Sequence, residues 1–193
     1  MIVGLAGYLK SGKSEVARAL QDKGFQRMRF AQPLKDMIKA LGLTDAHVDG
    51  HLKEEPCELL CGRTPRWAMQ TLGTEWGRDL IHSEIWITLW RARALAVLGN
   101  GGKIVVDDVR FHNELRAVRE LDGEVWRVNR PGLVHQAHVS ESYISEMNPD
   151  RELMNTRDIE YLRRQDFEAF EEKVRLSHRN LLQSEHVSAG SNL

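Results

Sequence analysis

The sequence predicts an α/β domain in which helices cover both faces of a doubly wound parallel sheet. Three observations support this fold class. Strand-like and helix-like stretches alternate along the 193 residues, a glycine-rich loop follows the first strand-like stretch, and an all-helical block interrupts the alternation. We expect a single domain with its core at about residues 1–32, 99–129 and 157–183, an inserted helical region at about 33–98 and a lid at about 130–156.

The glycine-rich loop is Gly7-Tyr8-Leu9-Lys10-Ser11-Gly12-Lys13-Ser14, between an apolar run at residues 1–6 and a helix-like stretch. It matches the P-loop pattern in full, which predicts the fold of a P-loop NTPase. The glycines let backbone N–H groups surround a phosphate, and the following helix adds the positive end of its dipole. We expect Lys13 to contact the β- and γ-phosphates of ATP and Ser14 to bind Mg²⁺. The residues expected to bind the nucleotide are Gly7, Tyr8, Lys10, Ser11, Gly12, Lys13, Ser14 and Glu15.

Composition and charge narrow the class of protein further. The chain is 41% hydrophobic and 28% charged, as in ordinary globular proteins. Its net charge of -1 provides no general attraction to nucleic acid or to anionic membranes, so we expect stable binding to neither. Because no signal peptide and no long apolar run is recognisable, a cytoplasmic location is the expectation.

The first part of the insert is expected to contain one regular helix. A strand at residues 25–30 precedes a helix at about 33–41, and residues 43–63 are polar and expected to be irregular. That irregular stretch contains Cys57 and Cys61, which we expect to be free thiols because no second ligand pair follows at zinc-site spacing.

Thr64 and Pro65 are typical of a helix start, as N-cap and first helical residue, and the helix is expected to end near Ile81. At 100° per residue, one arc of this helix is apolar and consists of Ala68, Met69, Leu72, Trp76 and Leu80. The opposite arc consists of Arg66, Gln70, Gly73, Thr74 and Gly77. Two interior glycines cost a helix about 1 kcal/mol each, so their shared face indicates close packing against another helix or a ligand across the backbone. We favour the ligand because the face is polar.

A second helix of the insert is expected at about residues 84–98, capped by Ser83. Trp86 and Trp90 on it are expected to be core residues or, alternatively, platforms for stacking a ligand. Its predicted core stripe consists of Ile85, Leu89, Ala92 and Ala96.

The second decisive stretch is Lys103-Ile104-Val105-Val106-Asp107-Asp108, which is typical of a buried parallel strand that ends in acids. In a P-loop protein that end of the sheet faces the phosphates, so Asp107 is a candidate for holding Mg²⁺ directly or through water. Arg110 and Asn113 follow the strand and are candidates for contacts with a substrate phosphate or base, at the start of a helix ending near Leu121.

The C-terminal part is expected to hold a strand at residues 123–128, then the lid, then a last short strand at 158–161. Arg130 at the base of the lid is a candidate for an arginine finger supplied in cis, or an exposed structural arginine. An amphipathic helix is expected at about 166–183, followed by a frayed tail.

Taken together, these stretches resemble the bacteriophage deoxynucleoside monophosphate kinases over most of the chain. The resemblance is carried by the P-loop, Phe30-Ala31-Gln32-Pro33-Leu34-Lys35, Arg66 and Gln70 with Thr71-Leu72-Gly73-Thr74-Glu75-Trp76-Gly77-Arg78, Asp107-Asp108-Val109-Arg110-Phe111-His112-Asn113-Glu114, and His138-Val139-Ser140-Glu141. It implies an adenylate-kinase-like core, a helical monophosphate-binding region and a lid. It also implies transfer of the ATP γ-phosphate to a deoxynucleoside 5′-monophosphate, for phage DNA synthesis in the host cytoplasm. In such proteins the C-terminal part reads as a strand, an asparagine-containing turn and a helix, which residues 158–165 match loosely.

On this hypothesis Lys13, Arg130 and Asp107 are the expected catalytic residues, and Ser14 and Asp107 the expected metal ligands. Arginine forks suit phosphate, so Arg66, Arg78 and Arg110 are expected to hold the monophosphate. Gln70 and Asn113 are expected to contact the base, and Trp76 or Trp86 to stack on it. The full expected substrate-binding set is Lys35, Arg66, Gln70, Gly73, Thr74, Trp76, Arg78, Trp86, Asp108, Arg110 and Asn113.

Two other functions stay open at this point. One is a P-loop kinase of a non-nucleotide metabolite, and the other is an ATP-dependent switch or a DNA-associated ATPase. Near-neutral charge and short length disfavour the DNA-associated version. A homodimer is compatible with the sequence, which does not determine the oligomeric state.

Overall fold

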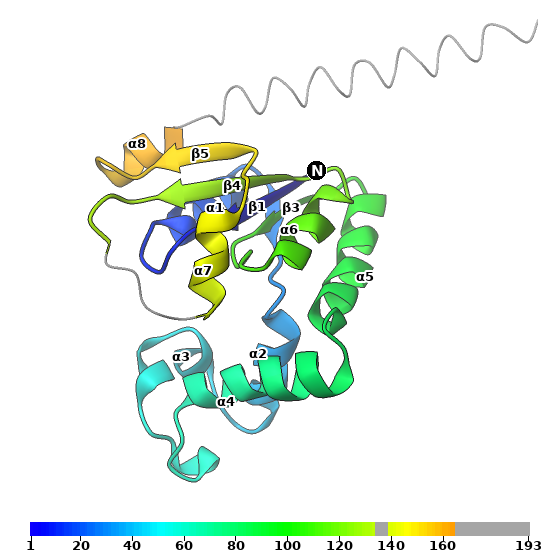
Figure 1. Ribbon diagram of the computed structural model, residues 1–193, viewed down its shortest axis with the longest axis vertical. Helices are drawn as coiled ribbons and strands as arrows, with labels where there is room; N and C mark the ends of the chain where they lie inside the picture. Colours follow the sequence, from blue (N-terminus) through cyan, green and yellow to red (C-terminus); the bar gives the residue numbers. More distant parts are fainter. Residues whose placement is uncertain (134–138, 165–193) are drawn as a thin grey trace, which may run out of the picture.

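A five-stranded parallel sheet forms the centre of the computed structural model, which describes residues 1–133 and 139–164 (Figure 1). Its order is β2-β3-β1-β4-β5. From β1 the chain moves to one side for β2 and β3 and to the other side for β4 and β5, so the predicted doubly wound sheet is confirmed. The strands are β1 Ile2–Ala6, β2 Phe25–Arg27, β3 Lys103–Val106, β4 Glu124–Asn129 and β5 Arg151–Met154.

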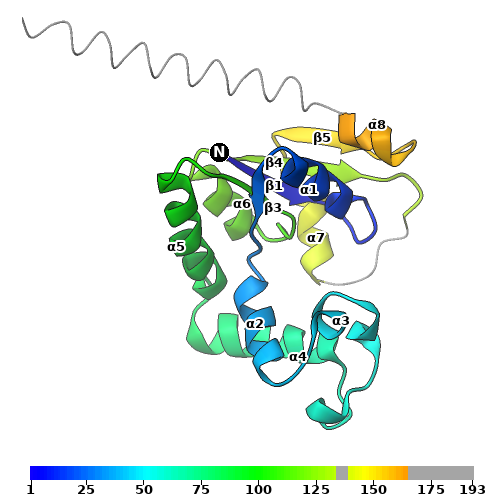
Figure 2. The same ribbon diagram turned by 180° about the vertical axis from the view of Figure 1, so that it is seen from behind.

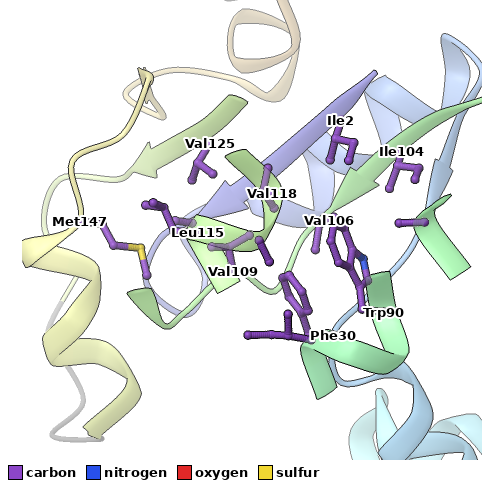
Figure 3. Packing of buried hydrophobic residues seen from close by; sticks show 14 residues of the cluster. Ile2, Phe30, Trp90, Ile104, Val106, Val109, Leu115, Val118, Val125 and Met147 are labelled. Atoms are coloured by element: carbon purple, nitrogen blue, oxygen red, sulfur yellow. The ribbon is translucent and has the colours of Figure 1, made fainter. Parts of the chain in front are cut away.

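Helices cover both faces of the sheet. Because successive side chains of a strand point to opposite faces, Ile2 and Val3 of β1 enter two different clusters. On one face the strands pack against α1 and α8, and on the other against α5 and α6, where Trp90 and Val118 lie among the buried side chains (Figure 3). The helices are α1 Lys13–Asp22, α5 Ile85–Gly99, α6 His112–Arg119 and α8 Ile159–Arg164. α7 Val139–Glu146 precedes β5 in the chain.

The elements of the helical insert lie next to one another on one side of the sheet in both views (Figures 1 and 2). Its own small core is formed by Leu34, Ile38, Leu43, Val48, Met69 and Trp86. Its elements are α2 Gln32–Ala40, α3 Asp45–Val48, the 3₁₀ turns η1 His51–Glu54 and η2 Glu58–Leu60, α4 Pro65–Thr71 and the π-helix η3 Leu72–Ile81.

The expectation that residues 43–63 are irregular is wrong in part, since α3, η1 and η2 all lie there. Local polar bonds stabilise these short elements; the Thr44 N–H, for example, donates to His47 Nδ1 at 3.2 Å. Cys57 and Cys61 in this stretch are not joined by a disulfide.

The helix predicted from Thr64 begins where expected, with the Thr64 hydroxyl accepting from the Trp67 N–H at 3.2 Å. From Leu72 onward it is a π-helix, and the projection at 100° per residue fails there. Trp76 and Leu80, predicted on the apolar face, are 40% and 76% exposed. The reason is that a π-turn closes over five residues and is wider than an α-turn, so each residue advances by a smaller angle.

Gly77 also departs from the preferred interpretation. A Cβ at this position would lie 2.5 Å from Trp86 Cζ2, so Gly77 permits close packing of η3 on Trp86 rather than the approach of a ligand. Gly73 is different, because a Cβ there would meet only Leu34 Cδ2 at 3.4 Å.

The cap and the core stripe predicted for α5 are both wrong. Its N-cap is Glu84 rather than Ser83, and the Glu84 side chain makes no capping hydrogen bond; Leu89 of the predicted stripe is exposed. The residues that are buried are Trp86, Ile87, Trp90 and Ala94. This helix is apolar on all sides, so periodicity alone cannot identify its core face, and the large indoles occupy the interior. Both tryptophans are thus core residues, and Trp90 packs against Phe30 with ring centroids 4.6 Å apart.

Near the C-terminus, the strand predicted at residues 158–161 is wrong, because α8 begins there. Asp158 Oδ1 accepts from the Tyr161 N–H at 2.7 Å, which favours a helix start. The last strand is instead β5, inside the predicted lid, with Leu153 opposite Val128. The strand, asparagine turn and helix implied by the resemblance therefore lie at residues 151–164, with Asn155 in the turn.

Other expectations need smaller corrections or cannot be followed. β2 ends at Arg27, before the predicted end at residue 30. The expected helix at 166–183, the tail after it and His138 lie outside the described residues. Across the described ranges, no helix combines the length and apolarity needed to cross a membrane.

Candidate active site

The P-loop connects β1 to α1 and depends on two glycines. Gly7 has φ +145°, and a Cβ there would lie 2.5 Å from the Val128 carbonyl oxygen of β4. Gly12 has φ +111°, and its Cβ would meet Asn155 Nδ2 at 2.7 Å. Other residues would be strained by these angles and excluded by these contacts, so glycine is required for the loop to follow this path.

Within the loop, the ammonium of Lys13 donates to the carbonyl oxygens of Gly7 and Tyr8 at 2.6 and 2.7 Å. The side chain of Asn155 donates to the Ser11 carbonyl at 2.8 Å, which ties the turn after β5 to the loop. Asn155 was not among the predicted site residues, because the sequence placed it in the lid.

A first cavity, which we call the P-loop cavity, has a volume of about 560 Å³. Of the residues predicted to bind nucleotide, all line it except Tyr8, which contributes its carbonyl to Lys13 instead. Asp107 and Arg130 line it as well, and the Arg130 guanidinium donates to the Lys10 carbonyl at 3.4 Å. The expected catalytic residues Lys13, Arg130 and Asp107 therefore share one cavity.

A second cavity, the insert cavity, has a volume of about 190 Å³. It has apolar walls from Leu34, Met69, Trp86 and other residues. Nine of the predicted substrate-binding residues line it, namely Lys35, Arg66, Gln70, Gly73, Thr74, Arg78, Trp86, Asp108 and Arg110.

Two predicted substrate-binding residues, Trp76 and Asn113, line neither cavity. The side-chain amide of Asn113 donates to Glu84 at 2.9 Å, at the start of α5. Trp76 packs beside Trp86, with ring centroids 6.4 Å apart.

The two cavities share a wall, so they adjoin. Four of the six residues common to both are cationic: Lys35, Lys53, Arg66 and Arg110; the other two are Gln70 and Asp108. A wall with this charge favours an anion such as phosphate.

The acids at the end of β3 have partners that the sequence did not indicate. Asp107 accepts hydrogen bonds from Arg27 and from Arg29, the latter at 2.9 Å. Burial alone would raise its pKa, but the hydrogen bonds from the two guanidinium groups outweigh burial and hold the pKa of Asp107 at about 2. Its negative charge is therefore present at neutral pH and already balanced by arginine.

Asp108 has a different environment. Its carboxylate accepts from the backbone N–H groups of Phe30 and Ala31, both at 3.0 Å, and so anchors the chain just before α2. Burial, with Asp107 beside it, raises the pKa of Asp108 above its usual range.

Arg78 is held by a buried partner. Its guanidinium donates to Glu114 at 2.8 Å and lies over the Phe111 ring, 4.3 Å from the centroid. Glu114 also accepts from the backbone of Arg110 at 2.8 Å. Burial raises the pKa of Glu114 to about 7, with the charge of Asp108 adding to the rise and Arg78 opposing it.

Several residues of the site were not predicted from the sequence, because they belong to no recognisable sequence motif. Arg29 joins Asp107 of the core to Asp49 of the insert, where its Nη1 donates at 2.9 Å. Asp49 also accepts from Lys35 at 2.5 Å, and Lys53 lies in the stretch expected to be irregular.

Known proteins resemble this chain in sequence and in fold. A model of the family described as deoxynucleotide monophosphate kinase matches residues 62–165. A protein of Acanthamoeba polyphaga mimivirus, named "Putative deoxynucleotide monophosphate kinase", is 34% identical in an alignment of 176 residues, and the match covers 83% of this chain and 91% of that protein.

Two solved structures have a TM-score of 0.52 to this fold. TT1252 from Thermus thermophilus is 17% identical, and the match covers 89% of this chain and 97% of that one. Dephospho-CoA kinase from Campylobacter jejuni is 14% identical, with 91% and 98% covered. At these identities they show the fold alone. The family model covers more than half of the chain and the viral relative most of it, so the chain belongs to the deoxynucleotide monophosphate kinase family, whose members are phosphotransferases.

Proposed function

We propose that this protein transfers the γ-phosphoryl group of ATP to the 5′-phosphate of a deoxynucleoside monophosphate, giving ADP and a deoxynucleoside diphosphate. The observation that carries the proposal is the pair of adjoining cavities with a cationic wall between them. A transferase needs its donor and its acceptor phosphates to meet, and one shared wall brings them together.

The P-loop cavity is the donor half. The P-loop amides and Lys13 bind the ATP phosphates, which replace the Gly7 and Tyr8 carbonyls as partners of the ammonium. Ser14 and Asp107 line this cavity and offer oxygen donors, which fits Mg²⁺ because this ion uses few protein ligands and keeps water and phosphate oxygens. Since Asp107 already bonds to two arginines, we expect it to act through water. When bound, Mg²⁺ offsets the negative charge of the phosphates.

The insert cavity is the acceptor half. Lys35, Arg66 and Arg110 in the shared wall bind the monophosphate, and the base lies deeper in the cavity. There the indole of Trp86 is fixed by its N–H, which donates to the Gly73 carbonyl at 2.8 Å, and presents a rigid apolar surface. Gln70 and Thr74 supply the polar contacts to the base.

In the transfer, an oxygen of the acceptor phosphate forms a bond to the γ-phosphorus. The bond from that phosphorus to the bridging oxygen breaks, and its electron pair stays on ADP. The protein contributes positioning and positive charge rather than covalent chemistry. Arg130 is the proposed stabilising arginine from the lid side of the P-loop cavity. The proposed lid is shortened to about residues 130–150, because β5 belongs to the sheet.

The test is a coupled assay of ADP formation over a panel of deoxynucleoside monophosphates, ribonucleoside monophosphates and non-nucleotide acceptors. We expect at least one deoxynucleoside monophosphate to raise ATP turnover most strongly. If none does, the proposal is refuted, and turnover with a non-nucleotide acceptor would favour a metabolite kinase.

The cellular setting is also a proposal. We infer that the protein acts in the cytoplasm of an infected cell, where it supplies precursors for viral DNA synthesis, as the viral relative suggests. A bacteriophage source and a homodimer stay predictions. Fractionation of infected cells and sedimentation velocity test location and oligomeric state.

A further inference from the structure

Lys53 lies in η1 of the insert, and its side chain lines both the P-loop cavity and the insert cavity. The turn that presents it is tightly packed. A Cβ on Gly50 would lie 2.8 Å from the Cα of Ala46, so this segment sits directly against α3. The side chain of Lys53 is half-buried.

The residues around Lys53 are anchored on both sides by ion pairs. Asp49 accepts from Lys35 Nζ at 2.5 Å and from Arg29 Nη1 at 2.9 Å. Glu54, directly after Lys53, pairs with Arg66 of α4. The backbone that carries Lys53 is therefore tied to α2, to the connection before α2 and to α4.

Lys53 differs from Lys35 and Arg66 in whether a carboxylate balances its charge. Lys35 and Arg66 in the shared wall each have a carboxylate partner. Within residues 1–133 and 139–164, the side chains of Lys53 and Arg110 make no ion pair with a carboxylate. Burial lowers the pKa of Lys53 to about 8; the charges of Arg66, Lys35 and Arg110 add to this, and Asp49 opposes it. A partly buried cation among other cations favours the binding of an anion, because the attraction to the anion offsets the loss of hydration.

We propose that Lys53 is a catalytic residue of the transfer, whose ammonium binds the phosphoryl group as it passes from the P-loop cavity to the insert cavity. Arg110, from the loop after β3, approaches the same wall from the core side. During the step the γ-phosphorus loses its bond to the bridging oxygen of ADP and gains one to the acceptor oxygen, and negative charge spreads over its other three oxygens. A lysine suits this position because it is a compact charge on a flexible stem. This proposal rests on the proposed function.

The experiment compares Lys53→Met, Lys53→Arg and a matched control, Lys39→Met. Lys39 is also in the insert, but its ammonium pairs with Asp45 and Asp36 and lines neither cavity. With ATP and the best monophosphate, we expect Lys53→Met to lower kcat by about a hundredfold or more, as for other residues that stabilise transition-state charge. The KM values should change little, Lys53→Arg should recover most of the loss, and the control should match the wild type.

A second measurement keeps the proposal testable if Lys53→Met folds poorly. In the wild type, kcat/KM should fall above pH of about 8 as Lys53 loses its proton, and this alkaline fall should vanish in Lys53→Arg. Thermal melting and ATP binding check each variant's fold.

Three outcomes would overturn the role of Lys53. The first is a wild-type kcat in a folded Lys53→Met variant. The second is a Lys53→Met variant in which only the monophosphate KM rises. The third is a fall of kcat/KM at alkaline pH that is the same in Lys53→Arg as in the wild type. A wild-type protein that phosphorylates no monophosphate would instead refute the proposed function.

Discussion

Replacing Gly77 by alanine tests whether the π-helix η3 is shaped by packing or by a ligand. The new methyl group would lie 2.5 Å from Trp86 Cζ2 and 2.9 Å from its Nε1, so the indole must move. Trp86 is 2% exposed and cannot move into solvent at small cost. A shift of the indole would also lengthen or break the hydrogen bond from its N–H to the Gly73 carbonyl.

Three effects set the size of the change in stability. Overpacking of a core costs about 1–3 kcal/mol, and a buried donor left without its partner costs about 1–3 kcal/mol more. Replacing glycine by alanine in a helix stabilises the folded state by about 1 kcal/mol, which offsets part of this cost. We therefore expect Gly77→Ala to lower the free energy of unfolding by about 3 kcal/mol, or the melting temperature by about 6–12 °C for a chain of this length.

The assay is urea unfolding followed by tryptophan fluorescence, with Gly73→Ala as the matched control. Gly73 lies on the same π-helix, but its added methyl group would contact only Leu34 at 3.4 Å, so the control should match the wild type or exceed it by up to about 1 kcal/mol. Equal stability of the two variants would refute the packing argument. Gly77→Ala should also raise the monophosphate KM, because Trp86 lines the insert cavity.

Three further predictions concern the site. Lys13→Ala should abolish phosphoryl transfer while circular dichroism shows an intact fold; residual wild-type activity would remove the P-loop from the mechanism. Arg66→Ala should chiefly raise the monophosphate KM, and an unchanged KM in steady-state kinetics would move the acceptor phosphate elsewhere. Asp107 has a pKa of about 2 in the folded state, so its stabilising effect is complete above its unfolded pKa of 3.8 and is lost as pH falls through 2. This pKa difference contributes about 2 kcal/mol to the free energy of unfolding at neutral pH. The stability of Asp107→Asn, measured as a function of pH, should therefore lack this loss at low pH. The same loss in the variant as in the wild type would contradict the role of Asp107.

The parts of the protein that could be predicted from the amino-acid sequence are those whose cause is local. The P-loop depends on glycines at fixed spacing, and Gly7 and Gly12 have the positive φ angles that only such residues tolerate. Thr64 starts α4 through a bond to a residue three positions away, and β3 is a continuous apolar run as in other buried parallel strands. These signals were sufficient to predict the α/β fold class and most of the residues of the loop that line the P-loop cavity.

The features that could not be predicted depend on contacts between residues that are distant in the sequence. The face of α5 that is buried was not encoded in its periodicity, because the helix is apolar all round and the positions of Trp86 and Trp90 in the core decide it. β5 is a short edge strand of two polar and two apolar residues, and it becomes recognisable only through its pairing with β4. The bond between Arg29 and Asp107 joins residues 78 positions apart, and Lys53 reaches the site only because the insert folds back over the P-loop cavity. No local pattern specifies such contacts, since their energy comes from burial and charge that exist only once the chain has folded.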